Sequence, residues 1–574
     1  MHIPKIVFYL VAFVLFVLLV WIGVEWYYFY TNTYEVVLKK YLTSYPDIYR
    51  KHLFVKQFFT YKTYQHALIW LLIGFNIVYL LKIYWWRYQK NIWLSIEKLK
   101  DGISFLWKNI RDIFRLHTAT QKKMLLGLMF CVLIHQVYMY RTIFVAMDES
   151  FSWLYFASQG VGVTITHYPV PNNHVFYNLC SSFWSIFIPD DILAMRMTAL
   201  LSLWVLLKVC YIYLYQKTNF ATAYFSCVIV GLGFSQSIFS VQARGYMLCT
   251  FFIVIALFCL FEYLEKRKSL YLFVFAISCI LGFYTIPVFL FAMMAFYGYL
   301  LWQFLQKKHQ DTFRVFFIVG LIVVGCVYVL YLPILVYSGK NALIGNENVS
   351  PTGYDGYHFF TYILPIAFRE SIMYVFSIPK YAAFTGALII AIVNVYLFKN
   401  RGKFQIPSFY KDFWAFILIS LFTTAVVICL MQAFPFYRVW TYYAVFLAFI
   451  LGFVLSQWMQ TFVNIRLSLF LGLMFIFSFA QFHREIQDFY EPQSYVYHKK
   501  LEQKVKEIIQ SEKTIYVLEE AFYIRFWLKY NDAEHLLKQR PCIADIVVQD
   551  IQQPPPTCHQ DFMDISFLRF YENN

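Results

Sequence analysis

Charged side chains are scarce in this sequence. Only 14% of its 574 residues are Asp, Glu, Lys or Arg, whereas about 25% are charged in a typical soluble domain. Hydrophobic residues make up 60% of the chain, and apolar runs of about 20 residues recur along it. Runs of that length cross the roughly 30 Å hydrocarbon core of a bilayer. The composition excludes an ordinary soluble domain and predicts an all-α polytopic membrane protein.

Several motifs are also missing. The chain has no CxxC pair, so neither a zinc ribbon nor a dithiol redox motif is indicated. Nine of its 11 cysteines lie between Cys131 and Cys429, mostly in apolar runs, which is typical of small core residues. Cys542 and Cys558 lie in a polar tail, and a disulfide between them requires an oxidising compartment. The first apolar run is too long for a signal-peptide core and lacks a small-residue cleavage site, so we expect a retained span.

We expect about 13 transmembrane helices. They are predicted near residues 5–28, 66–86, 124–147, 192–215, 221–240, 246–264, 269–284, 287–305, 314–336, 381–398, 412–434, 438–459 and 465–481. Pro287, in the short sequence YTIP, is all that separates two of these predicted spans.

Basic residues alternate from one connection to the next. Ten Lys and Arg residues lie between 82 and 123, whereas none lies between 148 and 191. Lys and Arg collect in cytoplasmic loops, so we place the basic connections in the cytoplasm. The segment 31–65, with six basic residues, is a mild exception on the outer side. The net charge of +16 follows from this topology, so we expect no nucleic-acid partner.

Three parts are predicted along the chain. Residues 1–123 hold two spans and a basic amphipathic segment on the inner leaflet, and residues 124–481 form the transmembrane core. The outer loops of this core are 148–191 and 337–380. Residues 482–574 are more polar and predict a small α/β appendage outside the cytoplasm, because two strand-like runs flank a helical one.

Interfacial helices are expected beside the outer face. The sequence NHVFYNLCSSFWSIF, residues 173–187, is apolar but too short and too interrupted to span a bilayer. Residues 357–376 in the second outer loop have the same character. Both suit helices that lie along the membrane surface.

Polar residues that suit catalysis fall on the predicted outer face. Two adjacent carboxylates, Asp148 and Glu149, stand where the third span leaves the membrane, a costly place for acidic groups. The other candidates on this face come from the first outer loop and two later turns: His167, Asn172, Asn173, His174, Arg244, Tyr246 and Arg438.

The order of these motifs resembles that of a known family. The sequences MDES, NNHVFYNL and ARGYML, followed by a late Pro-x-x-Arg, occur in this order on about a dozen spans. This arrangement is similar to polyprenyl-phosphate sugar transferases of the GT-C superfamily, specifically the protein O-mannosyltransferase and lipid A aminoarabinose transferase group (glycosyltransferase family 39-like). The resemblance covers roughly residues 120–480. This sequence departs from the family pattern in two ways. Two additional spans precede the core, and the proline pair that follows the histidine in the family is absent.

The resemblance implies a GT-C-like bundle and an inverting glycosyltransferase. A polyprenyl-phosphate-linked sugar would be the donor, and a lipid, glycan or protein hydroxyl the acceptor. Asp148 would act as general base, with Glu149 orienting it or holding sugar hydroxyls. Arg244, Arg438 and His174 would hold the donor phosphate. Asn172, Asn173, His167 and Tyr246 would contact substrate.

Two further questions stay open at the level of sequence. A divalent cation, Mg²⁺ or Mn²⁺, is compatible with a carboxylate pair and a histidine but is not established by them. An oligosaccharide polymerase or ligase, or a transporter or lipid flippase, is an alternative function. The acidic pair disfavours the first, and the absence of a recognisable inverted repeat disfavours the second. For the leading hypothesis we expect a multi-pass protein of the bacterial inner membrane with its active site facing the periplasm.

Overall fold

The computed structural model describes most of the chain. The described residues are 3–44, 59–169, 172–307, 310–344, 356–376, 407–431, 434–435, 437–459, 492–517, 522–538, 544–550, 561–565 and 568–572. The predicted spans at 381–398 and 465–481, and the cysteines at 542 and 558, lie outside them.

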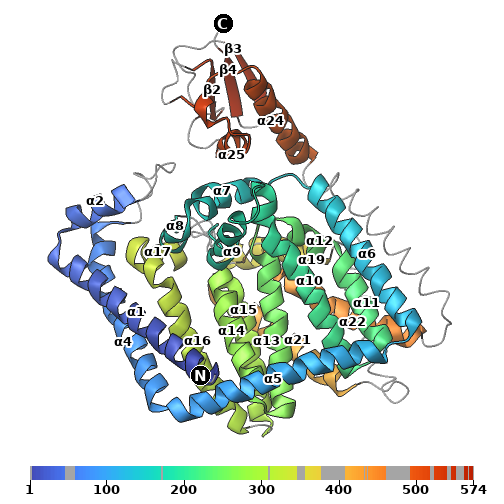
Figure 1. Ribbon diagram of the computed structural model, residues 1–574. Helices are drawn as coiled ribbons and strands as arrows, with labels where there is room; N and C mark the ends of the chain where they lie inside the picture. Colours follow the sequence, from blue (N-terminus) through green and yellow to red (C-terminus); the bar gives the residue numbers. More distant parts are fainter. Residues whose placement is uncertain are drawn as a thin grey trace.

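Long apolar helices dominate the fold (Figure 1). Nine helices in the described part of the chain are long and apolar enough to cross a membrane, which confirms an all-α polytopic protein. The helices up to residue 305 are α1 (Ile3–Thr31), α2 (Tyr34–Ser44), α4 (Tyr61–Arg87), α5 (Gln89–Leu116), α6 (Ala119–Thr142), α7 (Met147–Tyr155), η1 (Ala157–Gln159), α8 (Val161–Thr166), α9 (Val175–Ser185), α10 (Asp191–Lys217), α11 (Phe220–Leu232), α12 (Phe234–Val241), α13 (Tyr246–Lys266), α14 (Ser269–Thr285), η2 (Pro287–Phe289) and α15 (Leu290–Leu305). The later ones are α16 (Gln310–Tyr337), α17 (Lys340–Ile344), α18 (Gly356–His358), η3 (Phe359–Ile363), α19 (Leu364–Phe376), α21 (Ser408–Met431), η4 (Tyr437–Trp440), α22 (Thr441–Met459), α24 (Pro492–Gln510), α25 (Phe522–Tyr530) and η5 (Glu534–Leu536).

Two predicted spans differ from simple membrane-crossing helices. The span expected at 221–240 is divided into α11 and α12, which meet at an angle of 57°. Gly233 occupies the break, where a Cβ atom would lie 2.5 Å from the carbonyl oxygen of Ile229, so the bend requires glycine. The span expected at 269–284 corresponds to α14, which has 17 residues and is shorter than the other spans.

Side-chain caps fix where several of these helices begin. Thr118 and Gln121 form a reciprocal capping box at the start of α6. The carboxylate of Asp190 accepts a hydrogen bond from the backbone N–H of Leu193 and so starts α10. Asn219 caps α11 in the same way through the N–H of Thr222.

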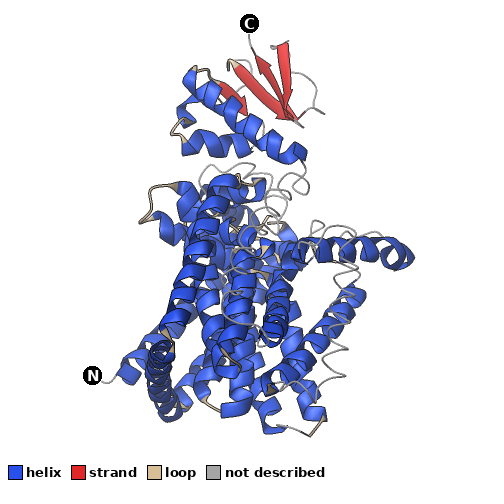
Figure 2. Ribbon diagram, turned by 90° about the vertical axis from the view of Figure 1, so that its right-hand side faces the viewer, coloured by secondary structure: helices blue, strands red, loops and turns tan. Residues whose placement is uncertain are grey.

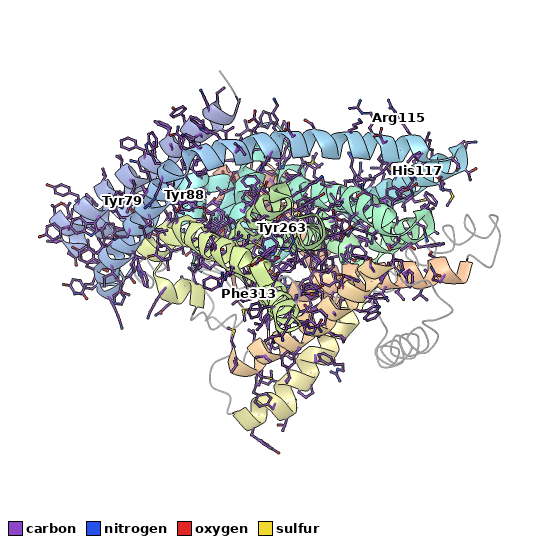
Figure 3. All side chains as sticks on the ribbon, turned by 90° about the horizontal axis from the view of Figure 1, so that it is seen from below. Tyr79, Tyr88, Arg115, His117, Tyr263 and Phe313 are labelled. Atoms are coloured by element: carbon purple, nitrogen blue, oxygen red, sulfur yellow. The ribbon has the colours of Figure 1, made fainter. Side chains whose placement is uncertain are left out.

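The helical bundle has two distinct ends. At one end the basic helix α5 lies across the bundle, and Figure 3 shows its length from below, with Tyr88 near its start and Arg115 and His117 near its end. The amphipathic helix predicted there is thus present. At the other end lie α7, α8 and α9 (Figure 1). The helical character expected at 173–187 and 357–376 is found in α9 and in α18 to α19.

The described residues from 492 onward form a separate layer beyond α7 (Figure 1), whose strands are red in Figure 2. Its sheet has the order β1-β2-β4-β3, from β1 (Ile515–Val517), β2 (Ile546–Asp550), β3 (Asp561–Ile565) and β4 (Leu568–Glu572). Strands β1 and β2 are parallel and the other pairs antiparallel. Helix α25 contacts the bundle through Tyr530, whose hydroxyl donates to Asp190 at 2.8 Å. The position of this layer outside the cytoplasm stays a prediction.

Candidate functional site

Three charged side chains from distant parts of the chain meet at the α7 end of the bundle. Asp148, the second residue of α7, accepts a hydrogen bond from Arg438 Nη1 to its Oδ2 at 2.7 Å. Nη2 of Arg244 lies 3.7 Å from the same oxygen. Arg244 comes from the turn between α12 and α13, and Arg438 from η4, which leads into α22. We call Asp148, Arg244 and Arg438 the arginine–aspartate cluster.

Tyr246 supports both arginines of this cluster. Tyr246 is the first residue of α13. The guanidinium carbon of Arg244 lies 5.7 Å from the centroid of its ring, and that of Arg438 lies 6.0 Å from it. The negative face of an aromatic ring attracts such cations. Tyr246 is itself buried. The Tyr246 ring thus helps to orient the two guanidinium groups, and the substrate contact expected of Tyr246 stays a prediction.

Asp148 remains partly open, since its side chain is 39% exposed. Burial alone would raise the pKa of this carboxyl group. The charges of Arg244 and Arg438 and the hydrogen bond from Arg438 outweigh that effect, so the pKa of Asp148 is lowered below its ordinary value. The carboxylate is therefore ionised near neutral pH and accessible enough to meet a ligand.

Glu149 has a different environment from its neighbour. It is fully buried, and its carboxylate pairs with Arg196 through Nε and Nη2, each at 3.1 Å. The same carboxylate accepts hydrogen bonds from the backbone N–H groups of Ala146 and Ala243. With both oxygens engaged and no exposed surface, Glu149 is not placed to hold sugar hydroxyls. The other role expected of Glu149, orienting Asp148, stays a prediction.

Arg196 on α10 completes this structural pair. Its guanidinium donates to the backbone carbonyls of Ile143 at 3.2 Å and Phe144 at 3.0 Å, just beyond the end of α6. No local pattern in the sequence identifies this pair, because Arg196 and Glu149 are 47 positions apart. Through Ala243, the pair also holds the turn that precedes Arg244.

Asn172 and Asn173 are adjacent but have unequal roles. Asn172 accepts a hydrogen bond from Arg244 on its side-chain oxygen, and its amide nitrogen donates to the backbone carbonyl of Asp148 at 3.3 Å. It therefore belongs to the edge of the cluster. Asn173 is fully buried and donates to the carbonyls of Thr164 at 2.8 Å and His167 at 2.9 Å. A substrate contact by Asn173 is therefore not supported, because its amide closes the preceding loop.

His174 lies beside the arginines and its tautomer can be inferred. Its Nδ1 accepts the backbone N–H of Gly245 at 2.7 Å, so in the neutral ring the proton is on Nε2. Burial, followed by the charges of Arg244 and Arg438, holds the pKa of His174 well below 6.5 and keeps the ring neutral. Nε2 lies 3.4 Å from Arg244 Nη2. Two donors side by side form a natural site for an anionic oxygen.

Gly245 permits this close approach. A side chain at Gly245 would place its Cβ 3.1 Å from His174 Nδ1 and 2.7 Å from Thr285 Cγ2. Any larger residue at this position would therefore force the turn or these two side chains to shift. The ARGYML sequence thus needs a glycine immediately after the arginine for a steric reason.

His167 is not joined to the cluster by its described contacts. Its ring packs against Phe156 at a centroid distance of 6.2 Å, and its carbonyl accepts from Asn173. Burial lowers the pKa of His167 to about 4. A direct contact with substrate, which the sequence suggested, is not supported by these surroundings.

Ser152, which the sequence did not single out, does join the cluster, because its hydroxyl accepts a hydrogen bond from Arg244 Nη1 at 3.2 Å. Its spacing of four residues from Asp148 on α7 was the available signal.

The cluster does not fit a divalent cation. Mg²⁺ and Mn²⁺ prefer several oxygen ligands, and in the described part of the chain no three His, Cys, Asp or Glu side chains are close enough to bind a metal ion. Asp148 is instead flanked by two guanidinium groups, which repel a cation. The geometry favours an anionic ligand.

Comparisons with known proteins do not add to this picture. No family model matches the chain, and neither a curated protein nor a solved structure is significantly similar to it.

Proposed function

We propose that this protein is an integral-membrane glycosyltransferase that moves a sugar from a polyprenyl-phosphate donor to an acceptor hydroxyl. The observation that carries the proposal is the arginine–aspartate cluster, in which a partly open carboxylate and two guanidinium groups meet at one end of a membrane bundle. A transferase of this kind needs both a base for the acceptor and cations for the leaving phosphate.

The chemistry assigns one role to each member of the cluster. Asp148 accepts the proton of the acceptor hydroxyl while that oxygen forms a bond to the anomeric carbon. The bond from the anomeric carbon to the phosphate oxygen breaks, and the polyprenyl phosphate leaves with its electron pair. Arg244 and Arg438, with the Nε2–H of His174, stabilise the negative charge that develops on this phosphate. In-line attack of this type inverts the anomeric configuration.

Donor binding also adjusts the base. In the structure the arginines compensate the charge of Asp148 and lower its pKa. A bound phosphate competes for the same guanidinium groups and adds a negative charge beside the carboxylate. Both effects raise the pKa of Asp148, so the carboxylate becomes a stronger base once the donor is in place.

An apolar groove offers a place for the polyprenyl chain. The groove has a volume of about 380 Å³ and is lined by residues of α9, α10 and α13, among them Phe176, Phe183 and Leu201. Phe176 is two residues from His174, so the groove begins near the proposed phosphate site. Helices α10 and α13 are membrane-length spans, which suits a lipid tail entering from the bilayer.

The test uses purified protein reconstituted in lipid nanodiscs. Mass spectrometry of lipids that copurify should detect a polyprenyl-phosphate sugar, and that labelled donor should then support transfer. Asp148→Asn should abolish transfer with the fold retained, whereas Arg244→Ala should weaken donor use. Normal turnover by Asp148→Asn would refute the assignment of the base. Failure of the wild-type protein to bind any polyprenyl-phosphate sugar would refute the function.

A further inference from the structure

A second pocket lies between α1, α2, α8 and α16. Its volume is about 420 Å³, within the range of roughly 300–1,000 Å³ that small-ligand pockets occupy. Four of its lining residues are aromatic: Trp21, Tyr28, Tyr41 and Tyr337. No member of the arginine–aspartate cluster is among the residues that line it. The pocket is thus distinct from the proposed catalytic site.

Glu25 is the unusual group in this pocket. It is one of two charged residues in α1, a helix long and apolar enough to span a membrane. Ionisable residues in such helices are costly and generally serve a function. Glu25 Oε2 accepts a hydrogen bond from the Tyr337 hydroxyl at 3.1 Å, and no Lys, Arg or His among the described residues forms an ion pair with it. The carboxylate therefore lacks a compensating cation from the described protein.

The aromatic walls suit a cation. Tyr41 and Tyr337 stack with centroids 5.0 Å apart, and the hydroxyl of Tyr337 contacts Glu25. Lys40 also lines the pocket, and its ammonium lies 3.8 Å from the centroid of the Tyr28 ring. Aromatic faces and a carboxylate together recognise ammonium groups, and Lys40 supplies the complementary charge for a phosphate.

The position of the pocket indicates the source of such a ligand. The pocket lies at the end of the bundle that carries α2 and α8, where α1 and α16 end (Figure 1). Helix ends of this kind are at the level of lipid headgroups. Much of the remaining surface of α1 consists of exposed apolar side chains such as Leu10, Phe13 and Val24, which suit contact with acyl chains.

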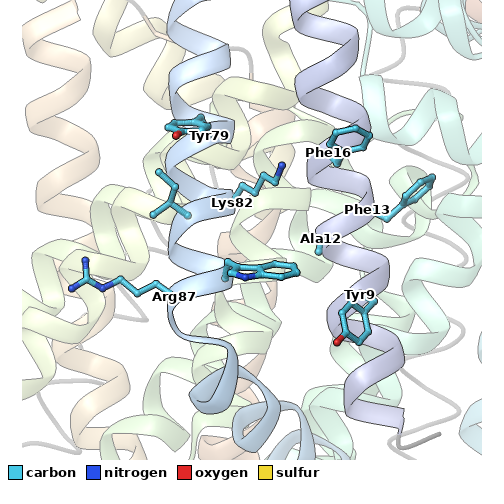
Figure 4. Close-up of a pocket in the computed structure, with 9 residues that line it drawn as sticks. Tyr9, Ala12, Phe13, Phe16, Tyr79, Lys82 and Arg87 are labelled. Carbon is cyan, nitrogen blue, oxygen red and sulfur yellow. The ribbon is translucent and has the colours of Figure 1, made fainter.

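The other end of α1 provides a contrast. A groove of about 780 Å³ there is lined by residues of α1 and α4, including Phe16, Trp86 and the basic Lys82 and Arg87 (Figure 4). Its lining contains no carboxylate. That groove suits an anionic headgroup, whereas the pocket at Glu25 combines one negative and one positive side chain.

We propose that the pocket at Glu25 binds the headgroup of a zwitterionic membrane phospholipid. The ammonium lies against Glu25 among the aromatic side chains that line the pocket, and the phosphate lies against Lys40. The site goes beyond the proposed glycosyl transfer, and its test measures lipid binding without reference to turnover.

The experiment is native mass spectrometry of the delipidated full-length protein. It is titrated separately with phosphatidylethanolamine and phosphatidylglycerol that have identical acyl chains. The wild-type protein should retain phosphatidylethanolamine, and Glu25→Gln should reduce that binding at least fivefold while binding of phosphatidylglycerol at other sites is unchanged. Glu35→Gln is the matched control, because Glu35 is an exposed carboxylate on α2 that does not line the pocket.

Further variants separate recognition from folding. Glu25→Asp keeps the charge and should retain part of the binding, whereas Lys40→Gln should weaken it through loss of the phosphate contact. Near-ultraviolet circular dichroism shows whether each variant is folded. Equal retention of phosphatidylethanolamine by folded Glu25→Gln and wild type would overturn the proposal. Equal affinity of the wild type for the two lipids, with Glu25→Gln affecting neither, would also overturn it.

Discussion

The buried pair of Glu149 and Arg196 yields the sharpest prediction about stability. Glu149→Gln preserves the shape of the side chain and removes its charge. Both partners are at most 1% exposed, so solvent cannot compensate Arg196 when the charge is lost. One of the two 3.1 Å contacts keeps an acceptor oxygen but loses its ionic character, whereas the other sets the amide NH2 against a guanidinium donor. One of the backbone N–H groups of Ala146 and Ala243 also loses its acceptor.

The magnitude follows from the burial. Removing one partner of a buried ion pair costs about 3–5 kcal/mol, because the remaining charge is left without compensation. Glutamine keeps one acceptor oxygen, and the carbonyls of Ile143 and Phe144 still accept from Arg196. We therefore expect a loss of about 3 kcal/mol in the free energy of unfolding. Glu265→Gln removes a carboxylate that is 61% exposed and should cost no more than about 1 kcal/mol.

The assay is equilibrium unfolding in mixed detergent micelles, followed by tryptophan fluorescence. Arg196→Met alone should also destabilise the protein, because it leaves Glu149 buried without its cation. The double variant should lose clearly less than the sum of the two single losses, with a coupling energy of about 2 kcal/mol. Additive losses, or a Glu149→Gln variant as stable as Glu265→Gln, would refute the reasoning.

Three further predictions concern the cluster. Arg438→Lys keeps the charge but not the planar fork, so the donor KM should rise about tenfold in steady-state assays, and an unchanged KM would contradict a phosphate contact. His174→Phe removes the Nε2–H donor and the acceptor of Gly245, so donor affinity should fall in a lipid-binding titration; unaltered affinity would place the phosphate elsewhere. The native pKa of Asp148 is lowered, so the ionised carboxylate stabilises the fold above about pH 4, and this contribution disappears as the pH falls through the lowered pKa. The difference in Tm between wild type and Asp148→Asn should therefore shrink as the pH is lowered from 5 through the lowered pKa of Asp148. A difference in Tm that stays constant over this range would contradict the lowered pKa.

Much of the architecture follows from local patterns in the sequence. Apolar length and scarcity of charge predict membrane spans, because the bilayer demands about 20 apolar residues per helix. The amphipathic helix α5 and the division between a basic end and the α7 end are also local properties of composition. The bend at Gly233 was not predicted, because an apolar run looks the same whether the helix is straight or broken.

The sequence alone determined that two acidic residues and several arginines would share one end of the bundle. Only the tertiary structure decided which of the two carboxylates is accessible to solvent and ligand. Neighbouring residues on a helix point about 100° apart, so Asp148 and Glu149 face different surroundings. One meets Arg438 and Arg244, and the other is sealed against Arg196. Such partners are fixed by packing between segments far apart in the chain, which no local pattern records.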